Sequence, residues 1–249
     1  PGLDGRNAVQ ADGESLFNLF SASKVVTAML IHRLDQEGLL RLDDAVAEYI
    51  PEFARHGKGG VTIRHVLTHR AGFAVVKGVE VTLDLLADSA GILEAIYDTK
   101  PRRYPGRKLA YHAVTGGYVL GELIRRVTGK PIQQTLEDTI TGPMGLESFR
   151  YGVREQDVHR IAQHANTGPP ARPPTSLFFT RAFGLTHAQC VEASNDRRYS
   201  DSVIPSANIY GTLSEIGDFF ECLLRQGTFG GKEIFAPRTV RRAVTAQSY

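Results

Sequence analysis

The sequence predicts a globular fold in which helices dominate and strands are few and short. Apolar residues recur at helical spacing in several segments, whereas the alternation that indicates a strand is sparse. The composition, 42% apolar and 22% charged residues, is ordinary for a folded globular domain. With 249 residues the chain can bury a full core, and it contains no internal repeat.

The first predicted element covers residues 16–37 and is a strand or turn that leads into a helix. Apolar residues surround the first two turns of this helix on nearly every side, so we expect it to lie inside the protein. Gly38 follows the helix and can adopt the left-handed conformation that ends many helices. Ser21 therefore stands where a buried helix begins.

Further helices are predicted at residues 62–67, 83–97, 116–127, 132–139 and 213–225. Gly129 ends the helix at 116–127, and Thr212 with Glu215 forms a capping-box pattern before the last helix. A proline-rich stretch at 167–175 predicts an irregular loop, which separates a first helical block from a less regular C-terminal part.

Charge and cysteine usage narrow the class of protein. The 29 basic and 27 acidic side chains are mixed along the chain, so no nucleic-acid-binding surface is predicted and we expect a small-molecule partner. Cys190 and Cys222 lack a metal-ligand spacing and are predicted to be free thiols in reducing surroundings, which favours a cytoplasmic location. The apolar run at 25–31 is too short for a transmembrane segment, and the chain as given begins without a secretion signal.

Ser21 and Lys24 are candidates for nucleophilic catalysis. Residues three apart on a helix project from one face, so the two side chains can come within hydrogen-bonding reach. The spacing alone is equally typical of a capping serine followed by a surface lysine. However, Lys24 lies where the helix is otherwise apolar, and burial can lower a lysine pKa until the amine acts as a base for a neighbouring hydroxyl.

The segment Phe20-Ser-Ala-Ser-Lys24 resembles the nucleophile motif of the penicillin-recognising serine hydrolases. The chain resembles further blocks of that family, in the same order, at residues 42–53, 61–72, 105–124, 142–146 and 204–208. Within the group, the chain looks most similar to the family VIII carboxylesterases, which have class C β-lactamase-like architecture. The resemblance implies an α+β fold of the β-lactamase/transpeptidase type, with a helical domain plus an antiparallel sheet, and neither a metal nor an organic cofactor.

The resemblance also assigns roles to individual residues. Ser21 would attack the acyl carbon, Lys24 would help to remove its proton, and Tyr111 as phenolate would be the shared general base. Without the surrounding motif, Tyr111 would be interpreted as an ordinary half-buried aromatic residue.

The chain departs from the family where the tyrosine motif, commonly Tyr-x-Asn, reads Tyr111-His112-Ala113. Alanine cannot make the side-chain hydrogen bond with which the asparagine clamps a β-lactam amide, so ester cleavage is favoured over β-lactam hydrolysis. We expect His112 and Ala113 to contact the substrate. The alternative for His112 is a surface histidine.

A second departure lies in the C-terminal part, where no Lys-Thr-Gly or equivalent motif precedes a strand. Lys232 follows a Gly-Gly pair, but Glu233 and Ile234 do not fit the pattern. In the family this strand supplies one backbone N–H to the oxyanion hole. We therefore expect residues 1–249 to form one β-lactamase-related catalytic domain that is truncated at its C-terminus and possibly at its N-terminus, so that helices dominate.

Other catalytic motifs are less consistent with the sequence. His65 and His69 have the spacing of a metal-binding helix, but no glutamate follows His65, so structural histidines are favoured. No Gly-x-Ser-x-Gly elbow is present. The leading hypothesis is a serine esterase that acts on small carboxylic esters. The alternatives are an acyltransferase, D-amino-acid peptidase or weak β-lactamase with the same residues, and an inactive ligand-binding relative; the oligomeric state stays open.

Overall fold

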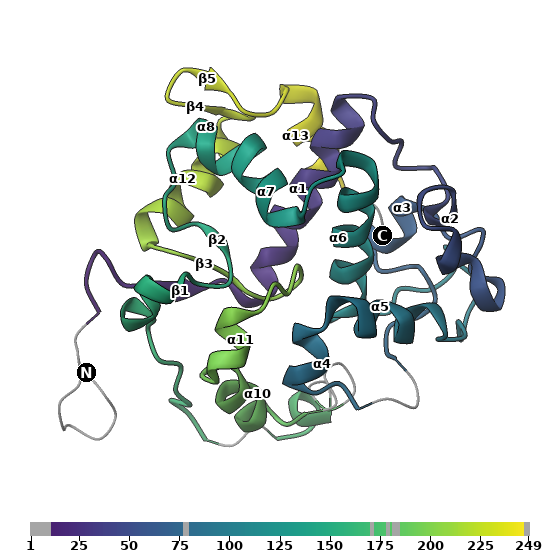
Figure 1. Ribbon diagram of the computed structural model, residues 1–249, viewed down its shortest axis with the longest axis horizontal. Coiled ribbons are helices and arrows are strands. Elements are labelled where there is room, and N and C mark those ends of the chain that lie inside the picture. Colours follow the sequence, from purple (N-terminus) through teal and green to yellow (C-terminus); the bar gives the residue numbers. More distant parts are fainter. Residues whose placement is uncertain (1–10, 77–79, 170–171, 178–179, 181–184, 247–249) are drawn as a thin grey trace.

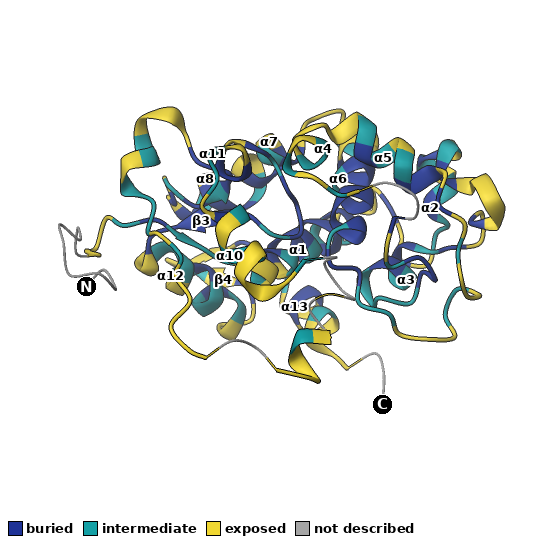
Figure 2. Ribbon diagram, turned by 90° about the horizontal axis from the view of Figure 1, so that it is seen from below, coloured by how far each residue is buried: buried dark blue, intermediate teal, exposed yellow. Residues whose placement is uncertain are grey.

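Helix α1 (Ser23–Gln36) runs through the middle of the molecule in the computed structural model, which describes residues 11–76, 80–169, 172–177, 180 and 185–246 (Figure 1). It packs against α6 (Thr115–Thr128) and α13 (Pro237–Val244). Val26, Met29 and Leu30 on α1 are almost completely buried, and both α1 and α6 are largely dark in the burial view (Figure 2). The prediction of a buried helix after Ser21 is confirmed.

A small antiparallel sheet lies beside the start of α1. Its strand order is β1 (Phe17–Asn18), β3 (Ile209–Gly211) and β2 (Arg150–Tyr151), with Phe17 opposite Gly211. The Leu19 N–H donates to the Ile209 carbonyl at 2.8 Å and so continues this pairing toward the helix. The pairing places residues 204–208 next to the N-terminus of α1, although the two segments are far apart in the sequence.

The block on one side of α1 is helical (Figure 1). It contains α2 (Val46–Tyr49), the 3₁₀ segment η2 (Pro51–Gly57), α3 (Ile63–Leu67), α4 (Leu83–Ala87), α5 (Ser89–Tyr97) and α6. The prediction of one helix over 83–97 is wrong, because the backbone leaves the helical region at Asp88. The Asp88 carboxylate accepts the N–H groups of Ala90 and Gly91, at 3.1 and 3.0 Å, and thereby starts a second helix.

The sheet side of the molecule carries the remaining elements. They are α7 (Ile132–Leu136), the π turn η3 (Glu137–Thr141), α8 (Gly142–Met144), the 3₁₀ segment η4 (Glu155–Arg160), α10 (His187–Ser194), α11 (Arg197–Asp201), α12 (Leu213–Leu224) and a hairpin of β4 (Thr228–Phe229) with β5 (Lys232–Glu233). The predicted helices at 116–127 and 213–225 are confirmed by α6 and α12. The first part of the predicted helix at 132–139 is α7, and its remaining residues, from Glu137, belong to the π turn η3.

Within the proline-rich stretch, residues 167–169 and 172–174 are irregular as predicted, whereas Thr175 already lies in a helical turn; residues 170–171 lie outside the described residues. Within the described chain, no helix has both the length and the apolar composition needed to cross a membrane. Cys190 and Cys222 are free, as predicted. The helix-dominated architecture with small antiparallel sheets is also confirmed.

Lys58 is a buried structural cation in the helical block. Its side chain is completely buried, and its ammonium group donates to the carbonyls of Arg55, Tyr97 and Thr99 at 2.9, 2.6 and 2.8 Å. A buried ammonium needs such acceptors, because its transfer from water into the protein interior is costly. Lys58 therefore ties the end of η2 to the end of α5.

Candidate active site

The turn before α1 presents Ser21 at the N-terminus of that helix. Phe20, which precedes it, has a left-handed backbone with φ of 45°. This conformation is uncommon for a bulky residue, and such backbone strain is concentrated at functional sites. The Asn18 side chain supports the turn, because its Oδ1 accepts the Phe20 N–H at 2.8 Å. A short 3₁₀ turn, η1 (Phe20–Ala22), then leads directly into α1.

Three side chains from two parts of the chain meet at this turn. Ser21 Oγ lies 2.7 Å from Tyr111 Oη, and Lys24 Nζ donates to Ser21 Oγ at 3.3 Å. Lys24 Nζ also lies 5.0 Å from the centroid of the Tyr111 ring. The hydroxyl of Ser21 thus contacts two groups that can exchange protons with it, and these are the groups that the sequence predicted.

The environment of Lys24 makes its neutral form more accessible than that of a lysine in water. Its ammonium group donates to the Ser206 carbonyl at 2.8 Å, but most of the side chain is removed from water. This burial lowers the pKa of Lys24 to about 8, because the charged form loses solvation. Near neutral pH, the fraction of Lys24 that is a free amine is therefore much larger than the corresponding fraction of a lysine in water.

The segment 204–208 holds the Ser206 carbonyl in place. Asn208 organises this segment: its Oδ1 accepts the Ile204 N–H at 2.9 Å, and its Nδ2 donates to the carbonyls of Tyr199 and Ser202 at 2.9 and 2.8 Å. The sequence indicates this segment as one of the blocks that resemble the family, but it predicts no role for Ser206. Since the contact uses a backbone carbonyl, no side-chain pattern could have indicated it.

The two residues after Tyr111 lie in different surroundings. Ala113 lines the groove described below, and its predicted contact with the substrate stays a prediction. His112 is completely buried, and its ring stacks on Phe73 with 5.2 Å between the ring centroids. The structure therefore contradicts both predictions for His112: it lies neither among the residues that line the groove nor on the surface. Its apolar surroundings lower the pKa of His112 to about 3.

Ser21 and Tyr111 open into a broad groove of about 2360 Å³. The surface of the groove wall is largely apolar, and its apolar residues include Phe20, Val81, Leu83, Leu86, Ala113, Val114, Ile161, Ala162, Val191, Ile204 and Ala207. An apolar wall with a few polar groups is typical of small-molecule sites. The arrangement suits a substrate with an apolar portion next to the group that Ser21 attacks.

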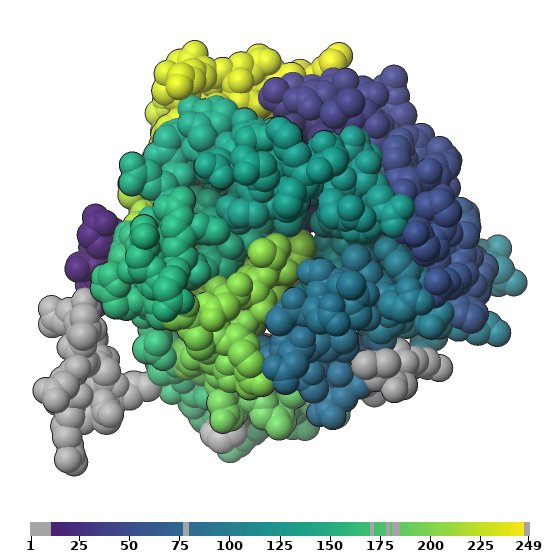
Figure 3. All heavy atoms as spheres, viewed as in Figure 1, coloured from purple at the N-terminus to yellow at the C-terminus, as the bar shows by residue number. Residues whose placement is uncertain are grey.

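Helices α4 and α11 pack against each other, and both contribute residues to the wall of this groove. Arg198 forms ion pairs with Asp84 at 3.0 Å and with Asp196 at 2.8 Å, so it joins the two helices. In the space-filling view, the green surface around residues 195–205 lies against the blue surface around residues 83–95 (Figure 3). The groove is therefore bounded by segments from both sides of the molecule.

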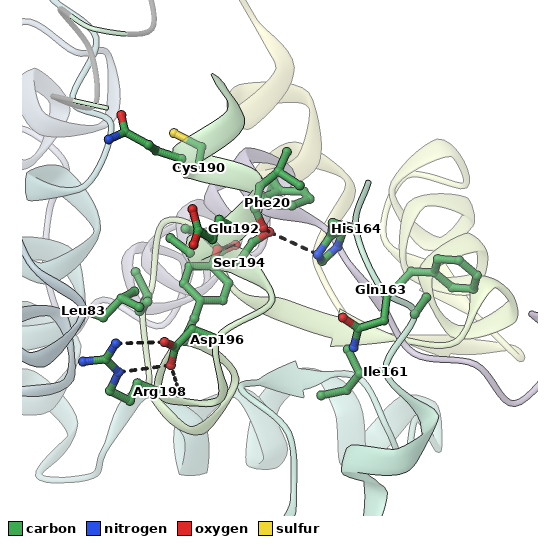
Figure 4. Close-up of a pocket in the computed structure, with 18 of the residues that line it drawn as sticks. Phe20, Leu83, Ile161, Gln163, His164, Cys190, Glu192, Ser194, Asp196 and Arg198 are labelled. Atoms are coloured by element: carbon green, nitrogen blue, oxygen red, sulfur yellow. Dashed lines mark hydrogen bonds and ion pairs between the residues drawn. The ribbon is translucent and has the colours of Figure 1, made fainter. Parts of the chain in front are cut away.

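A second serine also lies in the groove, where it faces a histidine. Ser194 Oγ is 3.2 Å from His164 Nδ1, and the two side chains point toward each other beside Phe20 (Figure 4). The Phe20 and His164 rings meet edge to face with 4.7 Å between their centroids. However, Ser194 is almost completely buried, and its hydroxyl donates to the Val191 carbonyl at 2.8 Å. This geometry favours a structural role for Ser194.

The described residues hold no group of three or more His, Cys, Asp or Glu side chains that could bind a metal ion. His65 and His69 instead accept backbone hydrogen bonds at Nδ1, from Thr62 and His112 respectively, at 3.2 Å in both cases. Lys232 is exposed on β5, and its ammonium group donates to the Pro143 carbonyl at 3.3 Å.

Comparisons with known proteins identify a family and similar structures for this chain. A sequence model of the family described as Beta-lactamase matches residues 2–247. The chain is 37% identical over 146 residues to Esterase/beta-lactamase LipL of Mycobacterium tuberculosis, which covers 58% of this chain and 33% of LipL. It resembles the crystal structure of a penicillin-binding protein homolog from Caulobacter crescentus with a TM-score of 0.83 and 28% identity, over 98% of this chain and 65% of that chain.

The crystal structure of a family VIII carboxylesterase is also similar, with a TM-score of 0.80 and 29% identity, over 92% of this chain and 60% of that chain. The chain thus spans about a third of LipL and less than two thirds of both solved structures.

Proposed function

The chain belongs to the Beta-lactamase family and has the β-lactamase/transpeptidase-like fold, and from this we propose that it hydrolyses carboxylic esters through an acyl intermediate on Ser21. The observation that carries the proposal is the position of Ser21 Oγ, within hydrogen-bond distance of both Tyr111 Oη and Lys24 Nζ. A serine hydroxyl is a weak nucleophile until an adjacent base accepts its proton.

The geometry supports the following steps. Ser21 Oγ attacks the ester carbonyl carbon while its proton passes to Tyr111 Oη, 2.7 Å away. The tetrahedral intermediate collapses, the bond from carbon to the alcohol oxygen breaks, and that oxygen takes the proton from Tyr111. A water molecule then attacks the acyl-serine ester, gives its proton to Tyr111 and releases the carboxylic acid, after which Ser21 regains its proton.

Lys24 prepares this site by losing a proton. With both Lys24 and Tyr111 protonated, neither group can accept the proton of Ser21. After one proton leaves the pair, Tyr111 can serve as phenolate beside a Lys24 ammonium, or the neutral amine can accept the proton itself. The two forms hold the same number of protons. The lowered pKa of Lys24, about 8, makes this state available near neutral pH.

Two observations support an ester as the substrate. The groove that Ser21 lines has a largely apolar wall, and Ala113 in that wall offers no side-chain hydrogen bond to a substrate amide. The names of LipL and of the family VIII carboxylesterase both refer to ester hydrolysis, and that of LipL also refers to β-lactams. We therefore propose ester hydrolysis as the main activity, with a cephalosporin as the second substrate to be tested.

The decisive experiment compares the purified protein with its Ser21→Ala and Ser194→Ala variants. Each protein is incubated with a chromogenic butyrate ester and with a chromogenic cephalosporin, and is labelled with a fluorophosphonate before mass spectrometry. We expect turnover of the ester and a single label on Ser21. Ser21→Ala should lose both, with a fall in kcat of about 10³-fold or more.

Ser194→Ala is the matched control, because Ser194 lies in the same groove and faces a histidine. It should retain both turnover and labelling. Equal turnover by Ser21→Ala, or loss of labelling only in Ser194→Ala, would contradict the proposal. No turnover of either substrate together with no label on Ser21 would favour a ligand-binding protein.

A further inference from the structure

Tyr111 lies in a part of the chain without regular secondary structure. Residues 108–112 belong to neither a helix nor a strand, and α6 begins only at Thr115. The position of the Tyr111 hydroxyl therefore depends on what holds this backbone, since a catalytic group displaced by about 1 Å can lose 10²-fold in rate.

His69 holds the backbone on both sides of Tyr111. Its carbonyl accepts the N–H of Ala110, the preceding residue, at 2.8 Å. Its side-chain Nδ1 accepts the N–H of His112, the following residue, at 3.2 Å. Between these two contacts, the His69 ring meets the Tyr111 ring edge to face, with 4.9 Å between the centroids. One residue thus contacts the tyrosine segment at three points.

The backbone of His69 is unusual in a way that serves this contact. Its φ is 58°, in the left-handed region that only a small fraction of non-glycine residues adopt. This conformation follows the end of α3, and the next residue, Arg70, continues the contact by accepting the Gly106 N–H at 2.8 Å. The turn at the end of α3 therefore directs both the carbonyl and the side chain of His69 toward the tyrosine segment.

We infer that His69 is the positioning residue of Tyr111: its carbonyl and Nδ1 hold the backbone on either side of the tyrosine, so that the phenol hydroxyl stays within hydrogen-bond distance of Ser21 Oγ. The inference rests on the proposed function, in which Tyr111 exchanges a proton with Ser21. His69 itself touches neither substrate nor Ser21 in this role, and it acts only through Tyr111.

The contact requires a neutral imidazole with its proton on Nε2, because Nδ1 accepts a hydrogen bond. Protonated Nδ1 would face the His112 N–H as a second donor. The titratable groups that face His69 are Lys24, Tyr111 and His112. Burial, assisted by the charge of Lys24, lowers the pKa of His69, so that Nδ1 stays free to accept near neutral pH.

The test uses three substitutions of His69. In His69→Asn, the amide oxygen takes the place of Nδ1, and asparagine tolerates a left-handed backbone. His69→Gly removes the acceptor without backbone strain. His69→Gln keeps a polar side chain but moves its acceptor one bond outward. If the glycine variant does not fold, the glutamine variant still shows whether the acceptor of His69 positions Tyr111. His65→Asn is the control, because His65 accepts a backbone N–H within its own helix.

Crystal structures of these variants give the first measurement, the distance between Ser21 Oγ and Tyr111 Oη. We expect it to stay near 2.7 Å in the parent, His69→Asn and His65→Asn, and to exceed hydrogen-bond reach in His69→Gly and His69→Gln. The second measurement is kinetic: kcat for the butyrate ester should fall about 10- to 100-fold in His69→Gly and His69→Gln, with KM changed less than about threefold, and His69→Asn should restore kcat.

An unchanged distance between the two oxygens in both His69→Gly and His69→Gln would overturn the inference. So would a parental kcat in those variants. Failure of the proposed function has a different signature, because the parent itself would then neither cleave the ester nor take the fluorophosphonate. In that event the crystallographic distance still decides whether His69 positions Tyr111.

Discussion

Gly117 lies so close to Ser206 that a methyl group on its Cα would come within 2.6 Å of both Cβ and the backbone nitrogen of Ser206. This contact joins the first turn of α6 to the segment 204–208. Because the Ser206 carbonyl accepts a hydrogen bond from Lys24, the missing side chain at Gly117 indirectly sets the position of the lysine.

We therefore expect Gly117→Ala to lower both stability and activity. The added methyl group must displace Ser206, and overpacking of this kind costs about 1–3 kcal/mol of unfolding free energy. Displacement of the Ser206 carbonyl should also reduce kcat for the ester. Urea unfolding and steady-state kinetics measure the two effects. Gly217→Ala is the control, since a methyl group there meets nothing within 4 Å and should stabilise α12 by about 0.5–1 kcal/mol.

The dependence of ester hydrolysis on pH should follow Lys24. Below its pKa of about 8, Lys24 is an ammonium and cannot accept a proton; above it, that proton has left and the site contains a base. We expect kcat/KM to rise about tenfold per pH unit at low pH and to level off above pH 8. A decline of kcat/KM as the pH rises from 7 to 8.5 would contradict this assignment.

Removal of one oxygen atom at Tyr111 should abolish most of the turnover. Tyr111→Phe keeps the aromatic ring that packs on His69 but removes the phenol hydroxyl that lies within hydrogen-bond distance of Ser21 Oγ. We therefore expect kcat to fall about 10²- to 10⁴-fold. The thermal unfolding midpoint should change little. Tyr104→Phe is the matched control, because Tyr104 is exposed on the surface and should retain full activity. Retention of more than a tenth of kcat by Tyr111→Phe would argue for a different base.

Lys58 should contribute to stability and not to catalysis. Lys58→Met leaves the buried carbonyls of Tyr97 and Thr99 without the ammonium donor, whereas the Arg55 carbonyl keeps the backbone N–H of residue 58 at 3.3 Å, and each buried acceptor left unpaired costs about 1–3 kcal/mol. We expect a loss of at least about 2 kcal/mol in unfolding free energy.

Lys130→Met is the corresponding surface control, because Lys130 pairs with the partly exposed Asp138 and should cost less than about 1 kcal/mol. Denaturant unfolding of both variants makes the comparison. A similar small loss in both would mean that water replaces the Lys58 ammonium.

Local sequence patterns predicted the parts of the structure that depend on neighbouring residues. The apolar run after Ser21 predicted the buried helix α1, and Gly129 and the Thr212–Glu215 pair predicted where α6 ends and α12 begins. The same patterns missed the break at Asp88, because the apolar spacing continues through it while the carboxylate caps a new helix.

Long-range packing decided the surroundings of His112. From its place next to Tyr111, His112 is predicted to contact the substrate or the solvent. In the structure, the rings of Phe73 and His69 pack against its ring instead. Neither of those residues is a sequence neighbour of His112, so spacing along the chain could not reveal its burial.

By itself, the sequence determined that Ser21 and Lys24 lie one turn apart where a buried helix begins, because a separation of three residues sets their geometry once the turn and helix form. The tertiary structure alone decided that the Tyr111 hydroxyl, 90 positions away, lies 2.7 Å from Ser21, and that the Ser206 carbonyl accepts a hydrogen bond from Lys24. Those contacts depend on packing between segments: Gly117 lets Ser206 approach α6, and His69 binds the backbone around Tyr111. Helical periodicity acts over one turn, whereas the chemistry of this site requires groups that only the folded chain brings together.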